Sequence, residues 1–336
     1  MRRMLRLIAA IPLMVILILG VVLLVLVTTS PRPRDAPGWV LLSPMPEGRG
    51  ETTTAVLDGR LYVIGGLLGL TGETSDAVAI YVPATDSWTD GPALPEPRHH
   101  AAAAMLDGAV YLTGGAPSVD RWSPETNAWR LEAGARSWVD VAPMPEPRLG
   151  HRAVAIEDRL YVVGGQGGTG ATLIYDPVAN AWETGAPLPE NRDHLAVVAV
   201  DGRAWAIAGR SGGLQDRVDV YDPATDEWHP GPSLPAPTSG AAEATADGLI
   251  LVSGGEDPSP VGDGVLDRHW WLDTRASDPE WRELPRPPLA IHGVQGAVID
   301  GRYYIVGGAT RAGGQSFVSW TDATQAFDLD ALTADR

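Results

Sequence analysis

The sequence contains no cysteine and no lysine, and these two absences exclude several kinds of chemistry. Without cysteine there is no disulfide and no thiolate to act as a nucleophile or as a metal ligand. Without lysine no Schiff base can form, and every fixed positive side-chain charge is an arginine. Acidic residues number 42 against 25 basic ones, and the formal net charge of −17 at pH 7 repels phosphate backbones. Nucleic-acid binding is therefore not expected.

The long apolar run of the chain lies at the N-terminus. Leu7 to Val27 carries no charged side chain and, as a helix, is long enough to span the roughly 30 Å hydrocarbon core of a bilayer. Three of the first six residues are arginine, so the positive-inside rule places the N-terminus in the cytoplasm and the rest of the chain outside. A cleaved signal peptide is the alternative, but its apolar region is about 7–15 residues long. We therefore predict an uncleaved signal anchor within residues 1–29 and a single-pass membrane protein.

After the anchor the composition changes twice. Residues 30–37 contain Pro31, Pro33 and Pro37, which favour an extended linker. Residues 38–329 consist of short apolar runs and turn signals, and no segment there has the length and 3.6-residue period of a helix. Residues 330–336 are expected to form a C-terminal tail.

One set of signals recurs six times after the linker, and its clearest copy runs from Met144 to Trp182. It consists of a Pro-x-Pro-Arg segment, an apolar run, a turn acid, a run ending in two glycines, Tyr-Asp-Pro, and a tryptophan. Recurrence at a period of this size indicates a repeat architecture. An Asp-Gly pair between two apolar runs predicts a β-hairpin, because both turn residues need positive φ. The turn pairs are Asp58-Gly59, Asp107-Gly108, Glu157-Asp158, Asp201-Gly202, Asp247-Gly248 and Asp300-Gly301.

Each copy predicts four strands, with an aromatic residue on the third and a tryptophan at the start of the fourth. The second copy is ambiguous because Trp129 and Trp138 both fit that last position. We place Trp122 on its third strand and interpret residues 130–137 as an inserted loop. The sixth copy ends after Phe327 without a tryptophan, and the segment that begins at Trp39 has the spacing of the missing strand. These features predict an all-β, six-bladed propeller closed by an N-terminal outer strand.

The repeat resembles the kelch repeat over residues 38–329. The resemblance rests on the order Pro-x-Pro-Arg, Asp-Gly, Leu-Tyr-Val-x-Gly-Gly and Tyr-Asp-Pro followed by tryptophan. It implies a disc with a central channel and ligand-binding loops on one face. Kelch proteins include scaffolds and enzymes, so the resemblance does not by itself fix a function.

Two sets of residues are candidates for a site at the channel mouth. Four arginines lie nine residues before the turn acid, where guanidinium groups favour a carboxylate or another acidic ligand. They are Arg49, Arg98, Arg148 and Arg192. The alternative is that each arginine bonds carbonyl or carboxylate groups of its own or the next blade and stabilises the ring. Two residues further on, the same strand face carries Glu51, His100, Gly150, His194, Gly240 and Gly293.

Glu51, His100 and His194 could transfer protons on a bound sugar or acid, or could simply be solvated at a wet channel mouth. His99, His100, His151 and His194 do not share one strand face, so neither a metal site nor a cofactor is expected. Glu256, Asp257 and Asp263 match no calcium-ligand spacing and are expected to form a solvated loop.

Three functions are compatible with these features. The first is a membrane-anchored, extracytoplasmic binding module that recognises a protein segment or a glycan through the channel-mouth loops, without catalysis. The second is an isomerase resembling the kelch-type sialic acid mutarotase (N-acetylneuraminate epimerase), in which the four arginines hold the carboxylate and Glu51 or a histidine moves protons. The third is a structural subunit of an envelope complex. Residues 7–27 would provide the membrane contact in each case.

Overall fold

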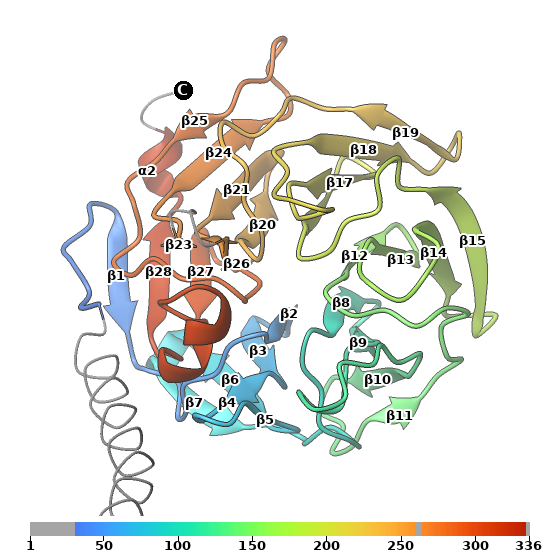
Figure 1. Ribbon diagram of the computed structural model, residues 1–336, viewed down its shortest axis with the longest axis horizontal. Coiled ribbons are helices and arrows are strands. Elements are labelled where there is room, and N and C mark those ends of the chain that lie inside the picture. Colours follow the sequence, from blue (N-terminus) through green and yellow to red (C-terminus); the bar gives the residue numbers. More distant parts are fainter. Residues whose placement is uncertain (1–30, 260–263, 334–336) are drawn as a thin grey trace, which may run out of the picture.

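The computed structural model describes residues 31–259 and 264–333, which form six four-stranded antiparallel sheets around a central axis (Figure 1). The six-bladed propeller predicted from the repeat is thus confirmed. From the inner to the outer strand, the first blade contains β2 (Thr53–Leu57), β3 (Arg60–Ile64), β6 (Val78–Val82) and β7 (Ser87–Asp90). The second contains β8 (Ala102–Leu106), β9 (Ala109–Thr113), β10 (Ala128–Glu132) and β11 (Val139–Asp140). The third contains β12 (Arg152–Ile156), β13 (Arg159–Val163), β14 (Ala171–Asp176) and β15 (Ala181–Pro187).

The other three blades follow the same order. The fourth contains β16 (Ala196–Val200), β17 (Arg203–Ile207), β18 (Val218–Asp222) and β19 (Glu227–Pro230). The fifth contains β20 (Ala242–Ala246), β21 (Leu249–Ser253), β24 (His269–Asp273) and β25 (Arg282–Glu283). The sixth contains β26 (Ala297–Ile299), β27 (Arg302–Val306), β28 (Thr324–Asp328) and β1 (Trp39–Leu42). Shorter elements lie in the connections: β4 (Leu67–Leu68), β5 (Glu73–Thr74), η1 (Pro83–Thr85), β22 (Glu256–Asp257), β23 (Gly264–Val265), η2 (Gly313–Val318) and α2 (Asp330–Thr333).

The predicted membrane anchor in residues 1–29 lies outside the described residues. Within the described residues, no helix is long and apolar enough to cross a bilayer. The predicted C-terminal tail begins with the short helix α2, and residues 334–336 are not described.

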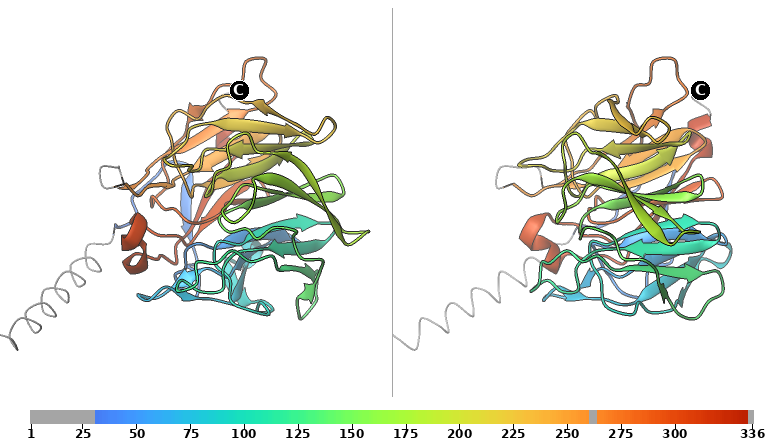
Figure 2. Two further views of the ribbon diagram at one scale, coloured as in Figure 1. Left: turned by 45° about the vertical axis from the view of Figure 1, so that its right-hand side comes forward. Right: turned by 90° about the vertical axis from the view of Figure 1, so that its right-hand side faces the viewer.

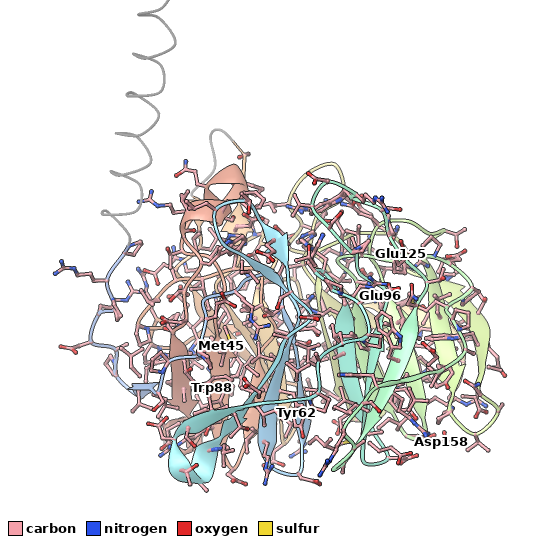
Figure 3. All side chains as sticks on the ribbon, turned by 90° about the horizontal axis from the view of Figure 1, so that it is seen from below. Met45, Tyr62, Trp88, Glu96, Glu125 and Asp158 are labelled. Atoms are coloured by element: carbon pink, nitrogen blue, oxygen red, sulfur yellow. The ribbon has the colours of Figure 1, made fainter. Side chains whose placement is uncertain are left out.

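The hairpin turns at the predicted positions connect the first two strands of every blade. The turn acids, from Asp58 to Asp300, have φ between 48° and 54°. Asp and Glu tolerate this left-handed conformation at a small cost, which explains why the turns use an acid followed in most copies by glycine. In the edge-on view of Figure 3, Asp158 of the third turn lies at one face of the disc, and Glu96 and Glu125 lie toward the other.

The ring is closed by the N-terminal strand, as predicted. Trp39 of β1 pairs with Phe327 of β28, and the two strands lie side by side in Figure 1. The Trp39 ring is 7% exposed and packs against the rings of His269, Tyr303 and Phe327 at centroid distances of 5.2–6.2 Å. Closure therefore removes an open sheet edge and also buries a large aromatic side chain.

Six tryptophans at the outer strands join neighbouring blades. Each indole N–H donates to a backbone carbonyl oxygen in or beside the outer strand of the preceding blade, at 2.7–3.1 Å. The donor and acceptor pairs are Trp39 and Pro285, Trp88 and Ser43, Trp138 and Pro92, Trp182 and Ala142, Trp228 and Ala186, and Trp281 and Pro232. The recurring tryptophan of the repeat thus connects each blade to the preceding one.

The second blade corrects the prediction made for it. Trp129 lies on the third strand, where it pairs with Leu112, and residues 130–132 continue that strand and are not part of an inserted loop. Trp129 and Leu131 point into the same buried cluster between the first two blades, which stabilises this register. Trp122 therefore lies before the third strand, in the loop after β9, and is 46% exposed.

A buried ion pair crosses the central channel below one mouth. Arg152 on β12 and Glu243 on β20 belong to the third and fifth blades, and Arg152 Nε lies 2.7 Å from Glu243 Oε1. Arg152 also donates to the carbonyl oxygen of Val294 at 3.2 Å. Glu243 borders a cavity of about 330 Å³ that is lined mainly by small and aliphatic side chains of the inner strands. The channel therefore holds a charged pair in an otherwise apolar wall.

Glu243 should make the stability of the protein depend on pH. Burial raises the pKa of its carboxyl to about 7, although the charge of Arg152 opposes this shift. Between about pH 4.5 and 7 the Glu243 carboxyl keeps its proton in the folded protein and loses it in the unfolded chain. The free energy of unfolding therefore falls as pH rises through this window, by about 3 kcal/mol. Thermal melts between pH 5 and 8 should show Glu243→Gln gaining stability relative to the unmodified protein as pH rises. A difference that stays constant with pH would contradict this assignment.

Candidate functional site

One residue from each blade contributes to a ring at the channel mouth. The six backbones have φ between 51° and 71°, and five N–H to O=C hydrogen bonds of 2.7–3.1 Å link consecutive members. The members are Glu51, His100, Gly150, His194, Gly240 and Gly293. The structure thus brings together the positions that the sequence placed in one register. The sequence pattern predicts these residues on the inner strands. They lie instead in a left-handed bend just before each inner strand.

Three members of this ring carry side chains, and these converge. His100 Nε2 lies 3.1 Å from Glu51 Oε2, and the rings of His100 and His194 lie 5.0 Å apart. Both histidines are about 5–6% exposed. At Gly293 a side chain would meet this cluster, because a Cβ there would lie 2.6 Å from Glu51 Oε1. Three titratable side chains thus meet at this mouth, whereas Gly150, Gly240 and Gly293 contribute no side chain to the ring.

A second layer of charged side chains surrounds this cluster, and the sequence did not identify it. Asp193 Oδ1 lies 2.5 Å from His194 Nδ1 and accepts a hydrogen bond of 2.7 Å from Arg210 Nε. Arg210 Nη1 lies 3.5 Å from Glu256, which in turn lies 3.5 Å from His292 Nε2. Glu256 directly follows the glycine pair of its blade, and Arg210 follows the equivalent Ala208-Gly209. Polar residues at that repeated position were the signal that could have revealed them.

Glu256 corrects an expectation about its loop. Its side chain is 6% exposed, and one carboxylate oxygen accepts a hydrogen bond from the backbone N–H of Gly313 at 2.8 Å. It is therefore part of the site and not of a solvated loop. Asp263 lies outside the described residues.

These side chains form the floor of a cavity of about 210 Å³ on the loop face of the disc. Its wall includes Trp122, Phe317 and Trp320, the last two from the connection that contains η2. Figure 2 shows η2 standing out from this face. The site therefore combines a charged floor with an aromatic wall.

The protonation of the cluster follows from burial and from the neighbouring charges. Burial by itself raises the pKa of Glu51, but the nearby histidines and Arg210 outweigh it and hold the pKa well below its usual range. Burial lowers the pKa of His100, and the Glu51 carboxylate opposes this shift. Burial opposes ionisation of Asp193 too, yet hydrogen bonds from His194, Gln166 and Arg210 lower its pKa. Glu51 is thus ionised as a carboxylate at neutral pH.

Glu51, His100 and His194 are also the described residues that could hold a metal ion. Their ligand atoms lie within 4.8 Å of one another, and two histidines with one carboxylate are a known donor set. However, Arg210 Nη2 lies 3.1 Å from both ring nitrogens of His194, where it would repel a cation. A metal bound through His194 would therefore share the site with the Arg210 guanidinium.

The four arginines of the predicted rim are already paired within their blades. Their side chains are 0–2% exposed, and each bonds carbonyl or carboxylate groups of its own blade. Arg192 illustrates this, since it donates to the carbonyl oxygens of Ala208 and Ala206 and forms an ion pair with Asp219 at 2.9 Å. Arg49, Arg98 and Arg148 are held in the same way. These contacts match the alternative interpretation, in which the arginines stabilise the ring.

The geometry defines a six-bladed β-propeller with a charged cluster at one mouth of its channel. Comparison with family models matches the Kelch motif to three segments of the chain, residues 48–95, 147–189 and 191–235.

Similar proteins and structures share parts of this architecture. Kelch-like protein 22 of Xenopus tropicalis and of Homo sapiens are each 43% identical to this chain over 56 residues, which is 17% of this chain and only 9% of either relative. The solved structure of YjhT superposes with a TM-score of 0.68 at 18% identity and covers 86% of this chain and 98% of its own. At this identity the superposition shows a shared fold.

Proposed function

We propose that this protein is a carbohydrate-active isomerase of the mutarotase type, which interconverts the anomers of a sugar acid at the channel mouth. The observation that carries the proposal is the cluster of Glu51, His100 and His194 beside Arg210, in a cavity of about 210 Å³. The cavity is smaller than the about 300–1,000 Å³ of pockets for drug-sized ligands, which suits a single sugar ring.

Mutarotation needs one base and one acid on the same sugar. The Glu51 carboxylate removes the proton from the anomeric hydroxyl while His194, paired with the Asp193 carboxylate, donates a proton to the ring oxygen. The bond between the anomeric carbon and the ring oxygen then breaks, and the anomeric carbon becomes a carbonyl. Rotation and closure on the other face reverse both proton transfers. Asp193 holds His194 in place through the 2.5 Å contact to Nδ1.

Arg210 is suited to hold the carboxylate of the sugar acid. It is the one arginine among the described residues that line this cavity, and 27% of its side chain is exposed. Its planar guanidinium can bind a carboxylate while keeping its bonds to Asp193 and Glu256. It thus takes the role that the sequence assigned to the four rim arginines.

Proton NMR of N-acetylneuraminate anomers tests the proposal. The purified full-length protein should accelerate exchange between the α and β anomers above the buffer rate at equal pH, and glucose, which lacks a carboxylate, should respond much less. An exchange rate equal to that in buffer alone would refute the proposal.

A binding module remains the second candidate, and exposed apolar side chains favour it. Trp122 and Leu70, in the loops of neighbouring blades, are 46% and 58% exposed. Exposed apolar side chains on the loops of one face are available for contact with a partner. A module of this kind, or a structural subunit of an envelope complex, would bind a glycan or protein segment without accelerating anomer exchange.

A further inference from the structure

Trp122 departs from the pattern that explains most tryptophans of the chain. Six of them join blades through their indole N–H groups, and Trp129 and Trp270 are almost fully buried. Trp122 instead lies in a loop with 46% of its surface exposed. A half-exposed indole at the edge of a charged cavity has no role in blade packing, so its position needs another explanation.

The Trp122 ring is held in place by the charged cluster itself. It lies near the rings of His99 and His100, with centroid distances of 5.4 and 4.8 Å, and the pair with His100 is T-shaped. Its indole N–H donates to Gln166 Oε1 at 3.2 Å, and Gln166 Nε2 donates to Asp193 Oδ2 at 2.9 Å. The same carboxylate contacts His194, so Trp122 is linked to the proposed acid through Gln166 and Asp193.

Two other aromatic side chains line the same cavity from the sixth blade. Phe317 and Trp320 form an edge-to-face pair with centroids 5.8 Å apart, and Trp320 Nε1 donates to the carbonyl oxygen of Gly69 at 3.1 Å. A Cβ on Gly72 would lie 2.3 Å from the Phe317 ring, which shows how closely the first blade packs against it. Loops of three blades therefore build an aromatic wall over the charged floor.

We infer that Trp122 is the platform on which the apolar face of a pyranose ring lies, so that the ligand is a cyclic sugar acid and not an open-chain hydroxy acid. Axial C–H groups give one face of many pyranoses an apolar character that suits an indole ring, while the hydroxyl and carboxylate groups need partners such as Glu51 and Arg210. This inference rests on the proposed function for the choice of a sugar acid, and it adds the residue that recognises the ring.

Binding can be separated from turnover with a methyl glycoside of N-acetylneuraminate, whose blocked anomeric oxygen cannot mutarotate. Calorimetric titration of the full-length protein should give a Kd that rises about tenfold in Trp122→Ala and by less than about threefold in Trp122→Phe. Val139→Ala, an exposed apolar residue on the outer strand of the same blade, should leave the Kd unchanged. Lactate, an open-chain hydroxy acid, should bind much more weakly and show no dependence on Trp122.

In the exchange assay, Trp122→Ala should raise KM by a similar factor and change kcat by less than about twofold, as expected for uniform binding. Phenylalanine keeps a ring but lacks the hydrogen bond to Gln166. Equal losses of affinity in Trp122→Ala and Trp122→Phe would therefore mean that Trp122 acts by positioning Asp193, and the platform would be refuted. An unchanged Kd in Trp122→Ala would refute it too. Glycoside binding that depends on Trp122 without anomer exchange would support the platform and refute the isomerase, whereas no glycoside binding would refute both.

Discussion

Replacing Glu51 with glutamine should slow the exchange of sugar-acid anomers by about 10²–10⁴-fold, the usual contribution of a positioned proton-transfer group. Glutamine has almost the same shape and can still contact His100, but its amide cannot accept the proton of the anomeric hydroxyl. Because the surrounding positive charges lower the pKa of Glu51, the carboxylate is present throughout the neutral range. The loss should therefore appear in kcat, as measured by NMR exchange spectroscopy at saturating sugar acid.

The matched control for this change is Glu47→Gln, at an exposed carboxylate four residues earlier. It should leave the rate unchanged. The pH profile gives a second check, since a base with a lowered pKa stays ionised well below pH 4.5. If the acid-side decline of the rate is centred near pH 6.5, the usual value for histidine, and persists in Glu51→Gln, the base is a histidine and not Glu51.

Replacing Trp39 with alanine should destabilise the protein by about 3–5 kcal/mol, as expected for a buried tryptophan truncated in a core. The change removes packing against His269, Tyr303 and Phe327 and deletes the indole donor to the Pro285 carbonyl. It also weakens the strand that closes the ring, so the loss should reach all six blades and unfold them together. Equilibrium unfolding in urea measures this as a shift of the midpoint.

Val40, the next residue on the same strand, provides the control because it is 45% exposed. Val40→Ala should cost less than about 1 kcal/mol, since it removes little buried surface. Equal losses of unfolding free energy in the two variants would mean that strand pairing, and not the buried indole, stabilises the closure of the ring. No loss in Trp39→Ala would show that the last blade closes through other contacts.

The recurring residues of the repeat were enough to predict the architecture. Glycine pairs, turn acids and tryptophans each act locally, in a hairpin, at a strand end or against the next blade, so their spacing specifies strands and blade number. The second blade was misassigned because Trp129 and Trp138 both fit the spacing of the tryptophan that starts the fourth strand, and Trp122 was placed on the third strand. Strand pairing and burial show that Trp129 belongs to the third strand. Trp129 fills the space between two blades, whereas Trp122 has no core to enter.

The candidate site was only partly predictable. Equivalent registers correctly brought Glu51, His100 and His194 together, because a closed ring places equivalent positions at one mouth. Register alone does not give side-chain direction. The rim arginines turn into their own blades to bond carbonyl groups, and Arg210, at a different position of the repeat, reaches the cavity instead.

The sequence by itself determined the all-β class, the number of blades and the closing strand. It also determined the common register of the six residues at the channel mouth, because each of these features depends on short-range patterns repeated along the chain. The tertiary structure alone decided which cations face the cavity, which carboxylate holds His194 and which aromatic side chains stay uncovered. Those features depend on contacts between blades far apart in sequence, where burial and hydrogen-bond geometry select one direction for each side chain.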